Sequence, residues 1–234
     1  MNSSCALDAA NTRVVLEKNI REFFSSRQIS EVKNALFPLQ INADQVSIFQ
    51  ISKQSRNEAV DRRHILEFSV LQWLQRDWSR ENVLSEVDAF LQAIFDGEFE
   101  PERRSFRDAF IQRLGFDPDE LSVAELRQEA RRLGLNASLG EDRLAWLKLM
   151  FVHFIEPTLG INEPLYLTDL PDQWRNSHHD GDVVAISHAD VFIDGIKVGS
   201  VLSQHHHVNV VFGLDRLLMI ILETRQIGKV LGGV

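Results

Sequence analysis

A strand, a turn and a helix follow one another between Val208 and Ile221, where the sequence reads VNVVFGLDRLLMII. A β-branched run ends at Phe212, Gly213 interrupts it, and an apolar stretch with helical spacing follows. The short first run, its β-branched residues and the glycine favour strand, turn and helix over one long helix. The chain is therefore expected to leave a sheet and enter a helix at Gly213.

Arg216 is unusual because it lies in the first turn of this predicted helix. A helix N-terminus carries partial positive charge, so an arginine among leucines is poorly placed for stability. The position suits a bound polyanion, because free backbone N–H groups and a guanidinium can hold it together. The alternative is that Arg216 pairs with Asp215 or another carboxylate at the edge of a core helix. Taken alone, this stretch favours the ion pair.

The composition excludes several classes of protein. The 234 residues suffice for one domain with a large core. A net charge of −9 argues against a general nucleic-acid binder, because no basic stripe is available to neutralise phosphates. The single cysteine, Cys5, excludes an internal disulfide framework and fits a reducing compartment. No apolar run is long enough to span a bilayer and no signal peptide begins the chain, so we expect a cytoplasmic protein without a membrane partner.

The predicted elements alternate between helices and β-hairpins. Their order is helix, β-hairpin, helical block, β-hairpin, strand and helix, without a βαβ rhythm. We therefore predict an α+β fold with an antiparallel sheet flanked by helices. Residues 1–234 are expected to form a single domain, with the helical block at about 79–156. Helices are expected over 12–27, 82–96, 105–114 and 141–155, and strands over 45–53, 66–73, 165–168, 188–193 and 196–202.

Two short signals fix local structure within this order. Asp194-Gly195 is flanked by two β-like runs, which is the pattern of a tight hairpin. Ser122 is followed three residues later by Glu125, which is the spacing of a capping box at a helix N-terminus. These signals predict a turn at 194–195 and a helix beginning after Ser122.

A polar loop between the first two predicted strands gathers groups able to hold a nucleotide. Arginine can bind phosphate in a bidentate way, and the ring of Phe68 on the returning strand can stack on a flat base. The alternative is a solvated hairpin tip in which Arg56 pairs with Glu58. The cationic residues of the loop are Arg56, Arg62, Arg63 and His64.

Metal and nucleophile chemistry find little support. Zinc needs three or four converging ligands, whereas consecutive histidines on an extended chain alternate between faces. We therefore expect the histidines to lie in exposed loops. No Gly-x-Ser-x-Gly elbow and no phosphate-binding loop with Gly-Lys-Ser/Thr is present. The histidines considered are His178, His179, His188 and the run His205 to His207.

Several segments, in the right order, resemble the class II aminoacyl-tRNA synthetases. Together they are most similar to the elongation factor P lysine ligase family, lysyl-tRNA synthetase relatives reduced to the catalytic domain. The resemblance extends over nearly the whole chain, with gaps. SRNEAVDRRHILEFSVLQW resembles motif 2, VVFGLDRLLMII motif 3 and REFFSSRQISEV motif 1, while FIEPTLGINEPLYLTDLP and DVFIDGIKVGS resemble the segments that lead to motif 3.

The resemblance implies a class II synthetase-like sheet, a homodimer formed through motif 1, and ATP with Mg²⁺. In such enzymes a carboxylate attacks the α-phosphate of ATP, and the resulting acyl-adenylate is passed to an amine or hydroxyl. Catalysis there consists mostly of positioning and charge neutralisation. The implied substrate is a lysine-like amino acid. The acidic charge and the lack of an anticodon-binding OB domain point to a protein acceptor, such as elongation factor P, and away from tRNA.

Site residues are implied by their places in the motifs. Arg56 would hold the α-phosphate and Arg216 the γ-phosphate, as the two catalytic residues. Gly213 would allow close backbone approach to the nucleotide. The remaining implied ATP-binding positions are Glu58 and His64 near the base and phosphates, and Phe68 against the adenine.

Departures from the family pattern support an alternative. Lys197 occupies the position of a glutamate that would help to hold Mg²⁺, and a lysine cannot ligate a hard cation. Asp190 falls where the family has another acid, and Lys197 could itself neutralise phosphate. Gln72 replaces a further glutamate, and segments after motif 1 and after Ser203 are missing. The alternative is a catalytically degenerate paralogue that acts as a nucleotide-binding or regulatory protein.

Overall fold

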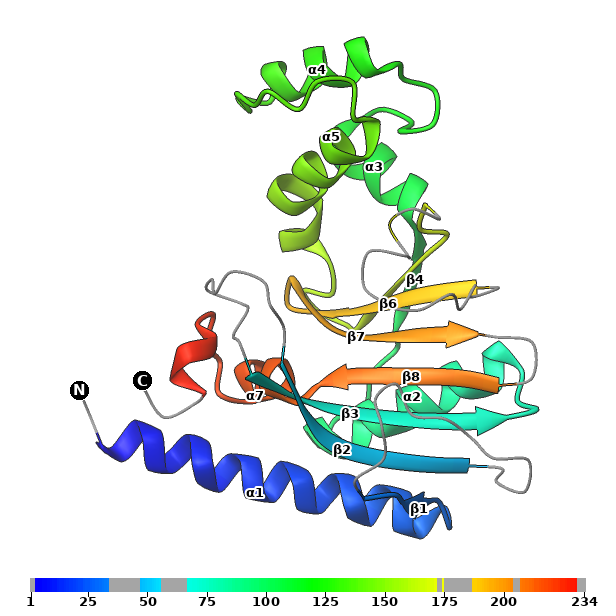
Figure 1. The fold of residues 1–234 in the computed structure, drawn as a ribbon, viewed down its shortest axis with the longest axis vertical. Helices are drawn as coiled ribbons and strands as arrows, with labels where there is room; N and C mark the ends of the chain where they lie inside the picture. Colours follow the sequence, from blue (N-terminus) through cyan, green and yellow to red (C-terminus); the bar gives the residue numbers. More distant parts are fainter. Residues whose placement is uncertain are drawn as a thin grey trace. The chain divides into compact units, whose positions relative to one another are not determined.

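The computed structural model describes residues 3–33, 47–55, 67–171, 174, 187–203 and 207–230 (Figure 1). The chain divides into two compact units, each with its own strands, helices and core. The expectation that residues 1–234 act as one catalytic domain stays a prediction. Unit 1 comprises Met1–Glu100, Ala185–Ser187 and Lys197–Val234, and unit 2 comprises Pro101–Val184 and His188–Ile196.

The strands of unit 1 are hydrogen-bonded in the order β1-β2-β3-β8-β7. The pairs β2–β3, β3–β8 and β7–β8 are antiparallel, and only the short β1 runs parallel to its neighbour among these described strands. Val70 lies opposite Ser52 on one side and opposite Gly213 on the other, which fixes the register of the three central strands. Their bounds are β1(Ser30–Glu31), β2(Ser47–Ser55), β3(Glu67–Arg76), β7(Ile196–Ser203) and β8(His207–Gly213).

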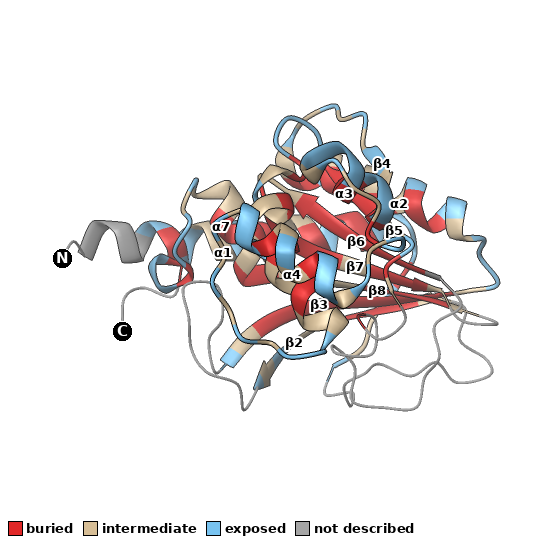
Figure 2. Ribbon diagram, turned by 90° about the horizontal axis from the view of Figure 1, so that it is seen from above, coloured by how far each residue is buried: buried red, intermediate tan, exposed pale blue. Residues whose placement is uncertain are grey.

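Aromatic rings join the helices of unit 1 to one face of these strands. The Phe24 ring stacks on Phe49 at 4.3 Å between centroids, and Trp73 lies parallel to Phe212 at 5.8 Å. Phe90 contacts both Trp73 and Phe212. Buried residues follow β3 and β8, as Figure 2 shows. The helices are α1(Ser3–Ser26), α2(Arg80–Phe95) and α7(Leu214–Ile221), with a 3₁₀ turn at Ile227–Lys229.

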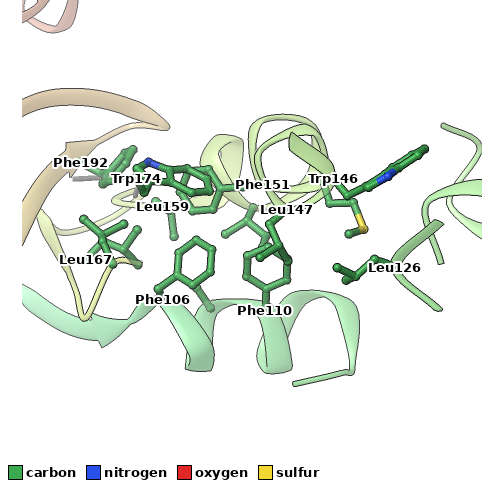
Figure 3. Close-up of a cluster of buried hydrophobic side chains, with 14 of the residues drawn as sticks. Phe106, Phe110, Leu126, Trp146, Leu147, Phe151, Leu159, Leu167, Trp174 and Phe192 are labelled. Atoms are coloured by element: carbon green, nitrogen blue, oxygen red, sulfur yellow. The ribbon is translucent and has the colours of Figure 1, made fainter. Parts of the chain in front are cut away.

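Unit 2 packs helices around a second aromatic core. Phe106 and Phe110 of α3 point towards Phe151 and Leu147 (Figure 3), and the ring centroids of Phe106 and Phe151 lie 5.8 Å apart. Among its strands, β5 is antiparallel to β6 and parallel to β4. The elements are β4(Glu102–Ser105), α3(Phe106–Leu114), α4(Val123–Arg132), α5(Arg143–Met150), a π-helix Phe151–Ile155, a 3₁₀ turn Glu156–Thr158, β5(Leu165–Thr168) and β6(Ser187–Ile193).

The structure confirms the predicted α+β fold class. Its helices and mostly antiparallel strands are consistent with a class II synthetase-like fold. The predicted hairpin turn is present, because φ is positive at both Asp194 (52°) and Gly195 (69°), as a two-residue type I′ turn requires. The predicted capping box is also present at Ser122 and Glu125. In the described part of the chain, no helix has the length and apolarity needed to cross a bilayer.

The capping box makes α4 sensitive to acid. The Ser122 hydroxyl and backbone N–H both donate to Glu125, at 2.7 Å, and these hydrogen bonds hold the pKa of Glu125 below its usual value. A carboxyl with a lowered folded pKa stabilises the fold above its unfolded pKa, and that contribution is lost as pH falls through the folded pKa.

We therefore expect Glu125→Gln to unfold at a lower temperature than the wild type at neutral pH, and this difference should shrink as pH falls towards ~3. Thermal unfolding followed by circular dichroism across this range measures it. Glu98→Gln, at an exposed position, serves as the control. A difference between Glu125→Gln and the wild type that stays constant with pH would contradict the assignment.

Candidate nucleotide site

One end of the unit 1 sheet gathers several of the sequence-predicted residues that the structure describes. The strands β2 and β8 end there and β3 begins there, since Gln54 lies opposite Phe68 and Val70 opposite Gly213. In Figure 1, α7 follows β8 at this end. Phe68 and Gly213 are thus brought close to the helix that carries Arg216.

The N-terminus of α7 differs from those of four other helices. Among the described residues, no side chain caps α7 at Gly213. The first backbone N–H groups of a helix have no partner within the helix and favour an anion. The N-termini of α2, α3, α4 and α5 are instead capped by the side chains of Ser79, Ser105, Ser122 and Asp142.

Arg216 is half-buried at this helix end. Its Nη1 donates to the carbonyl oxygen of Lys197, at 2.9 Å, which ties α7 to the start of β7. The neighbouring carboxylate of Asp215 is buried, with 2 % of its surface exposed, and it pairs with Arg13 of α1. The sequence offered Asp215 as a partner for Arg216, whereas the structure gives Asp215 a different arginine.

Three of the predicted ATP-binding residues, Arg56, Glu58 and His64, lie outside the described residues. Phe68 lies within them, half-buried at the second position of β3. Its predicted role against an adenine and the phosphate roles of Arg56 and Arg216 stay predictions.

Two glycines near this end of the sheet differ in the space available for a side chain. A Cβ on Gly199 would lie 2.8 Å from the Phe212 ring and from the Val211 carbonyl oxygen, inside van der Waals contact. A Cβ on Gly213 would meet only the Arg216 side chain, at 3.7 Å, which is ordinary contact. Close packing therefore requires glycine at 199, while the predicted nucleotide approach at 213 stays a prediction.

Gly199→Ala is expected to lower the free energy of unfolding by about 1–3 kcal/mol, because the crowding atoms include backbone. Gly213→Ala is the matched variant and should change it by less than about 1 kcal/mol. Urea unfolding of both variants measures the difference. Equal destabilisation of the two would contradict the packing seen here.

Asp190 does not offer the donor set that Mg²⁺ prefers. It is 2 % exposed, and its Oδ1 lies 2.6 Å from Nε2 of His188, which is also buried. Among the described residues, no three His, Cys, Asp or Glu side chains form a group that could hold a metal ion. Mg²⁺ takes oxygen ligands in octahedral geometry, and a carboxylate committed to an imidazole does not fit it.

Three polar groupings of side chains were not predicted from the sequence. His188, expected in an exposed loop, is buried beside Asp190 on the same face of β6. Their spacing of two along a strand could have suggested the pair. The Arg13–Asp215 pair gave no sequence signal because 202 positions separate its members. Buried amides join adjacent strands: Gln50 donates to Gln72 at 3.5 Å, and Gln72 to Asn209 at 2.9 Å.

Known proteins supply the comparison. No protein-family model matches the chain. A protein of Yersinia enterocolitica named elongation factor P–(R)-β-lysine ligase is 35% identical over 127 residues, 53% of this chain and 39% of the relative. The chain is similar to the elongation factor P lysine ligases. Proteins of that name from Photobacterium profundum (35% identity over 133 residues, 56% of this chain and 41% of the relative) and Pectobacterium atrosepticum (33% over 126, 53% and 38%) agree.

These similarities confirm the resemblance predicted from the motifs. The matched part of the chain spans about two fifths of the length of these curated relatives, between 38% and 41%. The similarity to elongation factor P lysine ligases thus covers only part of their length. The substrates that their names state are those of the relatives.

Proposed function

We propose that this chain is an ATP-dependent ligase of the lysyl-tRNA synthetase and elongation factor P lysine ligase type. It would activate a lysine-like amino acid as its adenylate and transfer it to a protein. The observation that carries the proposal is Arg216 in the first turn of α7, a helix that no described side chain caps, at the same end of the sheet as Phe68. The names of the relatives favour this ligase over a degenerate paralogue.

The proposed reaction has two steps. A carboxylate oxygen of the amino acid bonds to the α-phosphorus of ATP, and the bond from that phosphorus to the bridging oxygen breaks, so pyrophosphate leaves with the electron pair. An acceptor amine then attacks the acyl carbon, the bond to the phosphate oxygen breaks, AMP leaves and the amine loses a proton. Elongation factor P is the proposed acceptor, by analogy with the relatives' names.

The chain's own residues would position and neutralise the triphosphate. Arg56 would bind the α-phosphate and Arg216 the γ-phosphate, as the motif positions imply, and the Phe68 ring would stack on the adenine. Glu58 and His64 would border the base and phosphates, and Gly213 would let the backbone approach. Neutralisation by fixed cations lowers the barrier to attack on a polyanion.

Lys197 would supply positive charge where the relatives' pattern has an acid. The described residues around Asp190 do not fit Mg²⁺, so we expect ATP to bind equally well in EDTA and in excess Mg²⁺. Calorimetric titration under both conditions measures this. Affinity that depends steeply on Mg²⁺ would show that a metal site exists elsewhere and would remove the proposed role of Lys197.

Exchange of labelled pyrophosphate into ATP tests the function directly, because it requires a reversible adenylate-forming step. We expect exchange that depends on lysine or β-lysine. ATP binding without exchange, across all amino acids, would leave only a nucleotide-binding protein. No ATP binding would reject both alternatives.

We extend the proposal to a cytoplasmic homodimer in which residues 1–234 act as one catalytic domain. Its support is the outer face of α1, where Val14 is 69% exposed and Val15 55% exposed. Side chains of both charges lie beside them, which suits pairing of the helix with a second copy. The charged residues are Glu17, Lys18, Arg21 and Glu22. Light scattering that gives the mass of one chain would reject the dimer.

A further inference from the structure

Three elements of unit 1 meet at the carboxylate of Asp215. Nη2 of Arg13, from α1, pairs with Oδ1 of Asp215, and Arg13 Nη1 donates to the Ser69 hydroxyl at 3.2 Å. The backbone N–H of Ser69, in β3, donates to Oδ2 of Asp215 at 2.7 Å. Both oxygens of one carboxylate are thus held from two directions, by a helix and by a strand.

The carboxylate at the centre of this cluster is buried. Asp215 is 2 % exposed and Ser69 9 % exposed, while the Arg13 side chain is 24% exposed. A buried charge that loses its partner costs several kcal/mol, and the surrounding structure therefore keeps the pair together. Asp215 lies in the first turn of α7, directly before Arg216. The contacts of Arg13 and Ser69 with the Asp215 carboxylate, here called the clamp, consequently fix the turn from which Arg216 extends.

We propose that Arg13 is a positioning residue that sets the direction of the Arg216 guanidinium through Asp215. The inference rests on the proposed function, in which Arg216 binds the terminal phosphate of ATP. Arg216 is held on its other side by the Lys197 carbonyl, at 2.9 Å. Without Arg13, the Asp215 carboxylate keeps its hydrogen bond from the Ser69 N–H but loses its cationic partner. A small rotation of the first turn of α7 would then displace the guanidinium at the end of the long Arg216 side chain.

The chemistry at position 13 requires an arginine. Its planar fork reaches the Asp215 carboxylate and the Ser69 hydroxyl with two different nitrogens at once. A lysine has one ammonium and cannot serve both partners in the same geometry. Arg13 and Asp215 are also distant in the sequence, 202 residues apart, so only the fold brings them together.

The matched control lies on the same helix. Arg21 also pairs with carboxylates, at 3.1 Å to Glu31 of β1 and 3.3 Å to Glu17 of α1 itself. Arg13→Gln and Arg21→Gln therefore each remove one cation from α1, together with one ion pair at Arg13 and two at Arg21. Only the first removes the clamp on Asp215.

The experiment compares the affinities of each variant for ATP and for AMP, by calorimetric titration. AMP lacks the terminal phosphate, so displacement of Arg216 should weaken the binding of ATP and leave the binding of AMP unchanged. We expect Arg13→Gln to weaken the affinity for ATP about tenfold and to leave the affinity for AMP unchanged. Arg21→Gln should change neither. Ser69→Ala removes only the hydroxyl that supports Arg13 and keeps the backbone N–H bond to Asp215, so it should weaken ATP binding in the same direction by a smaller factor.

The outcomes separate two failures. If the wild type does not bind ATP, or binds it without help from Arg216, the proposed function fails and this inference with it. If the wild type binds ATP through Arg216, but Arg13→Gln weakens ATP and AMP equally or weakens neither, the clamp is only structural. If Arg13→Gln does not fold, Ser69→Ala decides: unchanged ATP affinity overturns the inference, and a selective loss supports it.

Discussion

Replacing Arg216 by alanine is expected to weaken ATP binding by about 10- to 100-fold, because a charge-assisted hydrogen bond contributes roughly 1.5–3 kcal/mol. The guanidinium would act together with the first backbone N–H groups of α7, which no described side chain caps at Gly213, and the variant keeps only these N–H groups. Calorimetric titration of ATP into the variant and the wild type measures the change. The loss should be larger for ATP than for AMP, which does not reach the γ-phosphate position.

Arg80→Ala is the matched control for this variant. Arg80 also begins a helix, α2, but the N-terminus there is capped by the Ser79 side chain. Its removal should leave ATP affinity unchanged. If Arg216→Ala also binds ATP as the wild type does, the phosphate role implied by motif 3 is wrong, and Arg216 serves only to tie α7 to β7.

Trp73→Ala is expected to lower the free energy of unfolding by about 3–5 kcal/mol, the usual cost of emptying a large buried site. Trp73 is fully buried, and its ring contacts Phe24, Phe90 and Phe212 from three different elements. The variant therefore loses contacts that join α1 and α2 to the sheet. Urea unfolding followed by fluorescence or circular dichroism measures the loss.

Trp78→Ala provides the comparison, because Trp78 is 37% exposed and lies just past the end of β3. It should cost less than about 1 kcal/mol, as surface substitutions do. Trp73→Phe should fall between the two, since the indole N–H of Trp73 has no hydrogen-bond partner among the described residues. Equal destabilisation by Trp73→Ala and Trp78→Ala would contradict the role of Trp73 in the aromatic core of unit 1.

Much of the fold was predictable because local signals and the hydrophobic pattern agree. Residues 208–221 combine a β-branched run, a glycine and helical spacing, and the structure has β8 and α7 there. The turn at Asp194 and Gly195 follows from the backbone freedom of those residue types. Where one residue pair decides a turn or a cap, sequence alone is sufficient.

Short or irregular elements were not predictable for the opposite reason. The strands β1 and β4 are two and four residues long, are mostly charged or polar, and pair in parallel with segments that long-range contacts select. The π-helix at Phe151–Ile155 continues a pattern that reads as one α-helix. Neither kind of element is long enough for its hydrophobic periodicity to be recognised in the sequence.

The candidate site was only partly predictable from the sequence. The motifs indicated Phe68, Gly213 and Arg216, and the sheet register brings all three to one end of unit 1. The clamp on Asp215 could not be foreseen, because burial decides which arginine a carboxylate meets. Arg56, the other half of the predicted phosphate pair, lies outside the described residues, so its role stays a prediction.

A crystal structure of the chain with a non-hydrolysable ATP analogue tests the central claim most directly. We predict density for the triphosphate within hydrogen-bonding distance of the Arg216 guanidinium and the α7 N-terminus, with the base against Phe68. Density for the analogue elsewhere on the protein, with Arg216 bound only to protein atoms, would contradict the claim.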